Sequence, residues 1–210
     1  MSTKFQNSVL LVIDVQNDFC PGGPLATPHG DEIFPVINRL SAHFPMVVAT
    51  KDWHPEGHIS FASRHNEEPG NVIQIDGLDQ VLWPDHCIPG TSGADYHPDF
   101  DTTDVNLILH KGTKKELDSY SAFFENDKKT PTGLQYYLKG HNIDNVYLLG
   151  LARDVCVFYS AMDAHRLGFK THLVTDGSKG VDIPEGNLKE AEDAMRDSGI
   201  PFITSDELLG

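Results

Sequence analysis

The chain has 210 residues, with 31 acidic against 16 basic ones, which gives a formal net charge of −15. This charge, with no block rich in Lys or Arg, argues against nucleic acid or an anionic membrane surface as a partner and favours a small neutral or cationic substrate. The longest apolar run near the N-terminus, residues 9–13, is too short for a signal sequence or a membrane span, so we expect a cytoplasmic protein.

Length and cysteine content indicate one reduced globular domain. A chain of this length supports one domain with a proper core, so we expect residues 1–210 to form it. The cysteines, Cys20, Cys87 and Cys156, are an odd and sparse set. They argue against a disulfide framework and for free thiols.

Short apolar runs alternate with helical patterns along the chain. The runs predict six strands, at residues 8–13, 46–50, 105–109, 146–149, 171–175 and 201–203. Periodicity between them predicts helices near residues 33–40, 132–140, 156–167 and 188–198, and a short helical turn at 121–126. We therefore predict an α/β fold, a parallel six-stranded sheet with helices on both faces and right-handed crossovers.

The stretch from about residue 52 to 103 interrupts this alternation. It is rich in Gly, Pro and His, contains both tryptophans and has no sustained periodicity. Long irregular insertions in compact domains are more often functional than idle, so we expect this one to contribute to binding. Asp76 inside it, like Asp31 before it, has no chemical partner in the sequence and is expected to be solvated.

Cys156 lies where cysteines become reactive. The apolar run 146–149 is broken by Gly150, and Asp154 is expected to cap the helix that follows and ends at Gly168. Cys156 would then sit in the first turn, where unpaired N–H groups and the helix dipole favour a thiolate and can hold an oxyanion. The alternative is a small buried hydrophobic residue, the commonest role of a free cysteine.

The predicted topology brings further polar residues to the same edge, because the carboxyl ends of parallel strands lie together. Asp14 follows the first strand, Asp52 the second, Lys111 the third and Cys156 the fourth. Asp14 could accept the thiol proton and Lys111 could stabilise the thiolate. One of the eleven histidines is the alternative base.

The Asp52-x-His54 pair indicates a metal site. Side chains two apart in an extended segment point to the same side. A carboxylate with an imidazole suits Zn, Mn or Fe, and the third ligand could come from His58, His65 or His86.

Six segments, taken in chain order, cover nearly the whole sequence and carry a resemblance to a known family. They are DVQNDFCPGG (14–23), KDWHPEGHISFASRH (51–65), WPDHCIPGTSGADYHP (83–98), KGTKKELDSYSAFF (111–124), GLARDVCV (150–157) and VTDGSKGV (174–181). Together they resemble the nicotinamidases of the isochorismatase-like cysteine hydrolase superfamily. The resemblance implies the isochorismatase-like hydrolase fold and conversion of nicotinamide to nicotinate and ammonia through a cysteine acyl-enzyme, in NAD salvage. It also implies tolerance of pyrazinamide.

The resemblance assigns the catalytic residues. The superfamily triad falls on Asp14, Lys111 and Cys156. The N–H groups of Ala152 and Cys156 would form the oxyanion hole, next to a cis peptide between Leu151 and Ala152.

The resemblance also assigns binding residues. One divalent metal ion, zinc ahead of manganese or iron, would be held by Asp52, His54 and His86, with the role of His58 varying between relatives. The aromatic pocket for the pyridine ring would be formed by Phe19, Trp83 and Tyr120.

Arg153 departs from the family pattern, which usually has Thr at this position. We expect a solvent-facing side chain, with perturbation of the thiolate or pocket mouth as the alternative. Two other functions stay open: a related small-molecule amidase or isochorismatase-type hydrolase, and a non-catalytic binding protein on this fold. The Asp52-x-His54 pair argues against the first and the complete Asp, Lys and Cys set against the second. The sequence leaves a homo-oligomer open.

Overall fold

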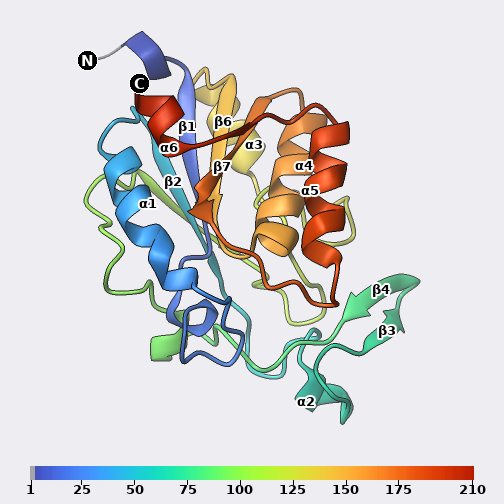
Figure 1. Ribbon diagram of the computed structural model, residues 1–210. Coiled ribbons are helices and arrows are strands. Elements are labelled where there is room, and N and C mark those ends of the chain that lie inside the picture. Colours follow the sequence, from blue (N-terminus) through green and yellow to red (C-terminus); the bar gives the residue numbers. More distant parts are fainter. Residues whose placement is uncertain (1–2) are drawn as a thin grey trace.

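A six-stranded parallel sheet runs through the centre of the computed structural model, which describes residues 3–210 (Figure 1). The strand order is β5-β2-β1-β6-β7-β8. The strands are β1 (Ser8–Ile13), β2 (Val47–Asp52), β5 (Leu107–Lys111), β6 (Asn145–Gly150), β7 (Lys170–Ser178) and β8 (Phe202–Ile203). The predicted six-stranded parallel sheet is confirmed, with strand ends shifted by up to three residues.

Helices cover both faces of this sheet, as Figure 1 shows. On one face lie α1 (Phe34–Ser41) and α6 (Ser205–Leu209), and on the other α3 (Leu134–Gly140), α4 (Phe158–Arg166) and α5 (Asn187–Asp197). Strand β1 serves both layers, since Leu10 and Val12 pack with the first set and Leu11 and Ile13 with the second. Burial on both faces explains why the β1 sequence is almost entirely apolar.

The connections reverse direction at β1. From β1 the chain moves outward to β2 and then β5, and after β5 it crosses to β6 on the other side of β1. The carboxyl ends of β1 and β6 therefore form the topological switch point, where open α/β sheets bind their ligands. Asp14 follows β1 directly, and Cys156 lies in the turn that follows β6.

The insertion after β2 is more regular than predicted. It contains α2 (Ala62–His65) and an antiparallel hairpin of β3 (Val72–Ile75) and β4 (Leu78–Val81), which projects from the main body in Figure 1. Asp76 and Gly77 form its two-residue turn with φ of 50° and 79°. An Asp-Gly pair between apolar runs is a strong hairpin signal, so the expectation of irregular structure there was wrong.

Two further expectations need correction. The short helical turn expected at 121–126 is not formed: residues 121–123 form bends, Phe124 forms an isolated bridge with Pro131, and Ser121, Ala122 and Phe123 are buried. The C-terminal helix α6 was not predicted, although Thr204 and Glu207 form a capping box before it. None of the helices within residues 3–210 has both the length and the apolar character needed to span a bilayer.

Candidate active site

Cys156 lies in a π-helical turn, Arg153–Val157, that leads into α4. The peptide between Leu151 and Ala152 is cis, as the resemblance implies. Asp154 does not cap the helix, because it lies inside the turn and Ala152 occupies the cap position. The Asp154 carboxylate instead accepts hydrogen bonds from the N–H groups of Val181 (2.9 Å) and Asp182 (2.8 Å), which fixes the loop after β7 to the cysteine turn.

Lys111 connects the polar groups at the switch point. Its Nζ lies 2.8 Å from Asp14 Oδ2 and 3.4 Å from Cys156 Sγ, and it also donates to Asp52 Oδ1. A fourth contact, 3.1 Å long, reaches the carbonyl of Ser119. All four charged or thiol side chains are at most 6% exposed. We call Asp14, Lys111 and Cys156 the thiol cluster.

Burial sets the protonation of the thiol cluster. It raises the pKa of Asp14 to about 6, although Lys111 opposes the shift. Burial also raises the pKa of the Cys156 thiol well above its usual value, again against the Lys111 ammonium. Burial therefore favours the thiol, in contrast to the thiolate that the helix position predicts, and Asp14 lies where it can act as the base.

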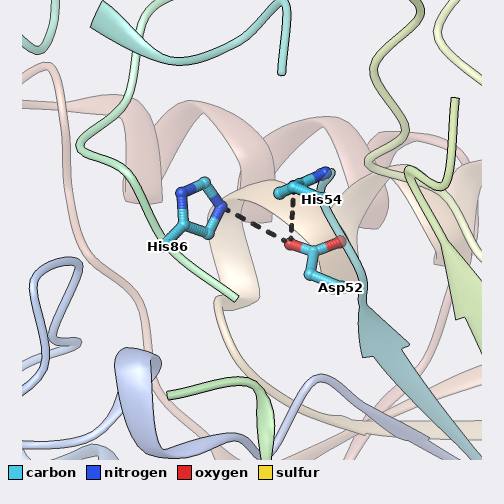
Figure 2. A group of neighbouring side chains, drawn as sticks. All are labelled: Asp52, His54 and His86. Atoms are coloured by element: carbon cyan, nitrogen blue, oxygen red, sulfur yellow. Dashed lines mark ion pairs between the residues drawn. The ribbon is translucent and has the colours of Figure 1, made fainter. Parts of the chain in front are cut away.

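Three ligand-type side chains meet beside the thiol cluster. The Nε2 atoms of His54 and His86 lie 3.6 Å and 3.8 Å from the same oxygen of Asp52, Oδ2, as Figure 2 shows. The predicted ligand set Asp52, His54 and His86 is thus brought together, with one ligand atom of each within 4.8 Å of the others. We call these three residues the Asp–His cluster.

The backbone orients both imidazoles. His54 Nδ1 donates to the carbonyl of Gly112 (3.1 Å) and His86 Nδ1 to that of Pro84 (2.7 Å), since a carbonyl can only accept. The Nε2 lone pairs therefore face Asp52, the arrangement that metal-binding histidines usually show. A Cβ at Gly112 would collide with the His54 ring, which explains the glycine there. The donor set fits zinc, manganese or iron(II).

The other two candidate ligands point elsewhere. His58 stacks on His54 with ring centroids 4.1 Å apart and hydrogen-bonds Ser60. The residues with which its side chain could share a metal ion are His54 and Asp118. His65 Nε2 bonds the carbonyl of Ile59 at 2.8 Å.

A small pocket of about 30 Å³ opens between the two clusters. The predicted aromatic residues Phe19, Trp83 and Tyr120 line it together with Ala152 and Cys156. Phe19 meets His86 edge-on, and Trp83 meets Tyr120 in the same way. These walls suit a flat aromatic ring.

Arg153 is neither solvent-facing nor directed at the thiol. Its guanidinium donates to Glu192 Oε1 on α5 (2.7 Å), to the Ser178 hydroxyl on β7 (2.9 Å) and to the carbonyls of Thr175 and Ser178. The side chain is only 16% exposed. Buried acceptors and a carboxylate can hold an arginine inside, so the solvent-facing expectation was wrong.

Two supporting residues were missed in the sequence. Thr50 Oγ1 donates to Asp14 Oδ1 (2.6 Å), and the Gln16 amide forms two hydrogen bonds, 2.9 and 2.8 Å long, with the backbone of Asp52. A polar residue at the end of an apolar strand was the available signal for Thr50. Gln16 gave none beyond its distance of two residues from Asp14.

A buried cysteine, lysine and aspartate at the switch point of a parallel α/β sheet are typical of a cysteine-dependent hydrolase. Comparison with known sequences agrees. The chain belongs to the isochorismatase domain family, whose sequence profile matches residues 8–207. It is 46% identical over 204 residues to the nicotinamidase of Acinetobacter baylyi, covering 97% of this chain and 95% of that relative.

Solved structures of similar proteins have the same fold. A nicotinamidase and pyrazinamidase from Acinetobacter baumanii superposes with a TM-score of 0.95 at 48% identity, covering 97% of this chain and 98% of the other. L. infantum PnC1, solved in complex with nicotinate, gives 0.84 at 34% identity, with 95% and 93% covered. A Pyrococcus horikoshii pyrazinamidase, solved in complex with zinc, gives 0.77 at 34%, with 94% and 99% covered.

Proposed function

We propose that this protein is a nicotinamidase that hydrolyses nicotinamide to nicotinate and ammonia through an acyl-enzyme on Cys156. The observation that carries the proposal is the position of Lys111, whose ammonium contacts Asp14, Asp52 and the Cys156 sulfur at once. Base, nucleophile and Asp–His cluster are thereby joined around one aromatic pocket. The similarity to nicotinamidases over nearly the whole chain supports the substrate.

In the first half-reaction Asp14 accepts the thiol proton as the sulfur attacks the amide carbon. The Lys111 ammonium stabilises the forming thiolate, and the N–H groups of Ala152 and Cys156 hold the oxyanion. Asp14 then returns the proton to the amine, and ammonia leaves. In the second half-reaction Asp14 deprotonates a water molecule that hydrolyses the thioester, which releases nicotinate and restores the thiol.

The Asp–His cluster would hold one divalent metal ion, zinc ahead of manganese or iron. A metal ion held by Asp52, His54 and His86 would supply a Lewis-acid site next to the aromatic pocket. The chain's own contribution is a fixed donor set beside an aromatic pocket, with His54 and His86 oriented by backbone carbonyls. Phe19, Trp83 and Tyr120 would position the ring.

The strand ends and the insertion have different roles in this proposal. Residues 1–210 act as a single domain in which the insertion of about 52–103 supplies metal and substrate ligands to strand-end catalytic residues. The enzyme would act in the cytoplasm in NAD salvage, and pyrazinamide, which has the same carboxamide on a flat ring, would be a second substrate.

Ammonia release from purified protein tests the proposal, measured across nicotinamide, pyrazinamide, benzamide and an aliphatic amide. The expected order has nicotinamide and pyrazinamide well ahead of benzamide, which lacks the ring nitrogen. Failure to release ammonia from any pyridine or pyrazine carboxamide would contradict the proposal.

A further inference from the structure

A second cavity lies directly beside the catalytic pocket and is much larger. It has a volume of about 470 Å³ and is partly open to solvent, against about 30 Å³ for the catalytic pocket. Asp118 and Tyr120 line both cavities, so their side chains form the wall between them. A substrate bound at Cys156 is therefore separated by a single layer of side chains from space for a much bulkier group.

One residue of the projecting hairpin holds this wall in place. Gln80 Nε2 donates to Asp118 Oδ2 (2.8 Å) and lies 3.4 Å from the Tyr120 hydroxyl. Trp83 Nε1 donates to the same hydroxyl at 3.1 Å, which links the wall to the aromatic pocket. Gln80 is 6% exposed, whereas Leu78 on the same strand is 40% exposed.

The burial of Gln80 needs a reason, because an amide side chain is costly to bury unless it is hydrogen-bonded. The hairpin does not need it: the pairing of β3 with β4 rests on the backbone, and the turn on Asp76 and Gly77. The Gln80 amide also bonds the carbonyl of its hairpin neighbour Val81 (2.8 Å), but its bonds to other side chains all go to the wall. Its place in the structure is thus explained by Asp118 and Tyr120.

We propose that Gln80 determines specificity by bracing Asp118 and Tyr120 as a partition that restricts the catalytic pocket to small, unsubstituted aromatic carboxamides. The inference rests on the proposed nicotinamidase function. Opening the partition would join the two cavities and admit pyridine carboxamides that carry a bulky ring substituent. Ile59, Ile75 and Leu78 give the second cavity apolar surface. Its lining has more acidic side chains (Asp76, Asp79, Glu116, Asp118 and Asp127) than basic ones (Lys128 and Lys129), so the substituent should be neutral or cationic.

The test compares Gln80→Ala and Gln80→Leu with a matched control, Gln74→Ala. Gln74 is the other glutamine of the hairpin; its side chain is exposed and bonds Asp79. For each protein, kcat/KM is measured for nicotinamide and for nicotinamides bearing a phenyl group at each ring carbon in turn. The readout is the ratio of bulky to parent substrate, which a general loss of stability would not change.

Both Gln80 variants should raise that ratio at least tenfold for one ring position, while the Gln74 variant stays within twofold of wild type. Leu keeps most of the bulk of Gln without its hydrogen bonds, so a rise confined to Gln80→Ala would overturn the bracing role. An unchanged ratio in both variants, with circular dichroism like that of wild type, would overturn the proposal as a whole.

A second readout does not depend on turnover. Peptide mapping gives the rates at which iodoacetamide and the bulkier N-phenylmaleimide alkylate Cys156. The Gln80 variants should raise the relative rate of the bulkier reagent at least fivefold, and an unchanged ratio contradicts the partition. If wild-type protein fails to hydrolyse nicotinamide but the Gln80 variants still show this change in alkylation, the proposed function is rejected and the partition is supported.

Discussion

The thiol cluster and the Asp–His cluster are in contact, because Lys111 of the first lies against Asp52 of the second, but they are built differently. The three residues of the thiol cluster come from the ends of β1 and β5 and the turn after β6, and the Lys111 ammonium lies against both the carboxylate and the sulfur. In the Asp–His cluster His54 and His86 come from loops of the insertion, and their lone pairs converge on a single oxygen of Asp52. The first cluster is chemically complete, whereas the second has the donors of a site that needs a cation. The two should therefore fail in different ways when disrupted.

The largest effect should come from removing the nucleophile. We expect Cys156→Ala to lower kcat/KM by at least ~10⁴-fold on every amide, because no other group can form the acyl-enzyme. Metal content, measured by atomic absorption, should not change, because the Asp–His cluster is intact. Cys20→Ala is the matched control, a second buried free thiol whose pKa burial raises to about 12. It should keep turnover within about threefold, and a comparable loss there would contradict the assignment.

Removing a metal-ligating side chain should affect the Asp–His cluster and leave the thiol cluster reactive. We expect His86→Ala to lose bound metal and ~100-fold in kcat/KM for nicotinamide, because a misplaced ring loses rate as well as affinity. Cys156 alkylation should stay within about twofold of wild type. His65→Ala, a histidine of the same insertion that bonds only the Ile59 carbonyl, should retain both metal and activity. If thiol reactivity fell together with activity in His86→Ala, the clusters would not be separable.

The pH dependence should report on Asp14. The reaction needs its carboxylate ionised, and burial raises its pKa to about 6. Thus kcat/KM should be constant above this pH and fall ~10-fold per unit below it. The Thr50 hydroxyl bond lowers the pKa of Asp14, so Thr50→Val should move this acid limb to higher pH. A limb that stayed in place would mean that another group is the base.

The smallest effect on activity should come from Arg153, which serves neither cluster directly. Arg153→Thr removes the hydrogen bonds to β7 and the ion pair with Glu192 on α5. We therefore expect the free energy of unfolding in urea to fall by ~1–3 kcal/mol. Turnover at 25 °C should stay within about threefold, and the acid limb should not move. A shifted limb would show that the guanidinium acts on the thiol cluster after all.

The comparison also separates what the sequence could predict from what it could not. Five of the six strands have at least five residues, and the polar residues near their carboxyl ends fall at one edge by topology alone, which is why the thiol cluster was predictable. The Asp–His cluster depends on where a long loop brings His86, which local pattern does not specify. From spacing alone His58 and His65 were equal candidates, and only the resemblance favoured His86.

Each expectation that proved wrong has an identifiable structural cause. Arg153 was expected in solvent because most arginines are exposed, and the acceptors that bury it lie 22 to 39 residues further along the chain. Asp154 was expected to cap a regular α-helix, but the turn is π-helical and its cap position lies two residues earlier, at Ala152. The hairpin was missed despite its Asp76-Gly77 signal. Its residue Gln80 acts through tertiary contacts with Asp118 and Tyr120 that no local pattern encodes.

The central claim is that Cys156 forms an acyl-enzyme, in contrast to direct attack by a metal-bound water. Partitioning with hydroxylamine tests it most directly, because this nucleophile competes with water for a thioester. With nicotinamide as substrate we expect nicotinohydroxamate to rise with hydroxylamine concentration, while ammonia released from nicotinamide equals the sum of hydroxamate and nicotinate. The account would be contradicted if ammonia equalled nicotinate alone at every hydroxylamine concentration, and if wild-type protein formed no more hydroxamate than Cys156→Ala does.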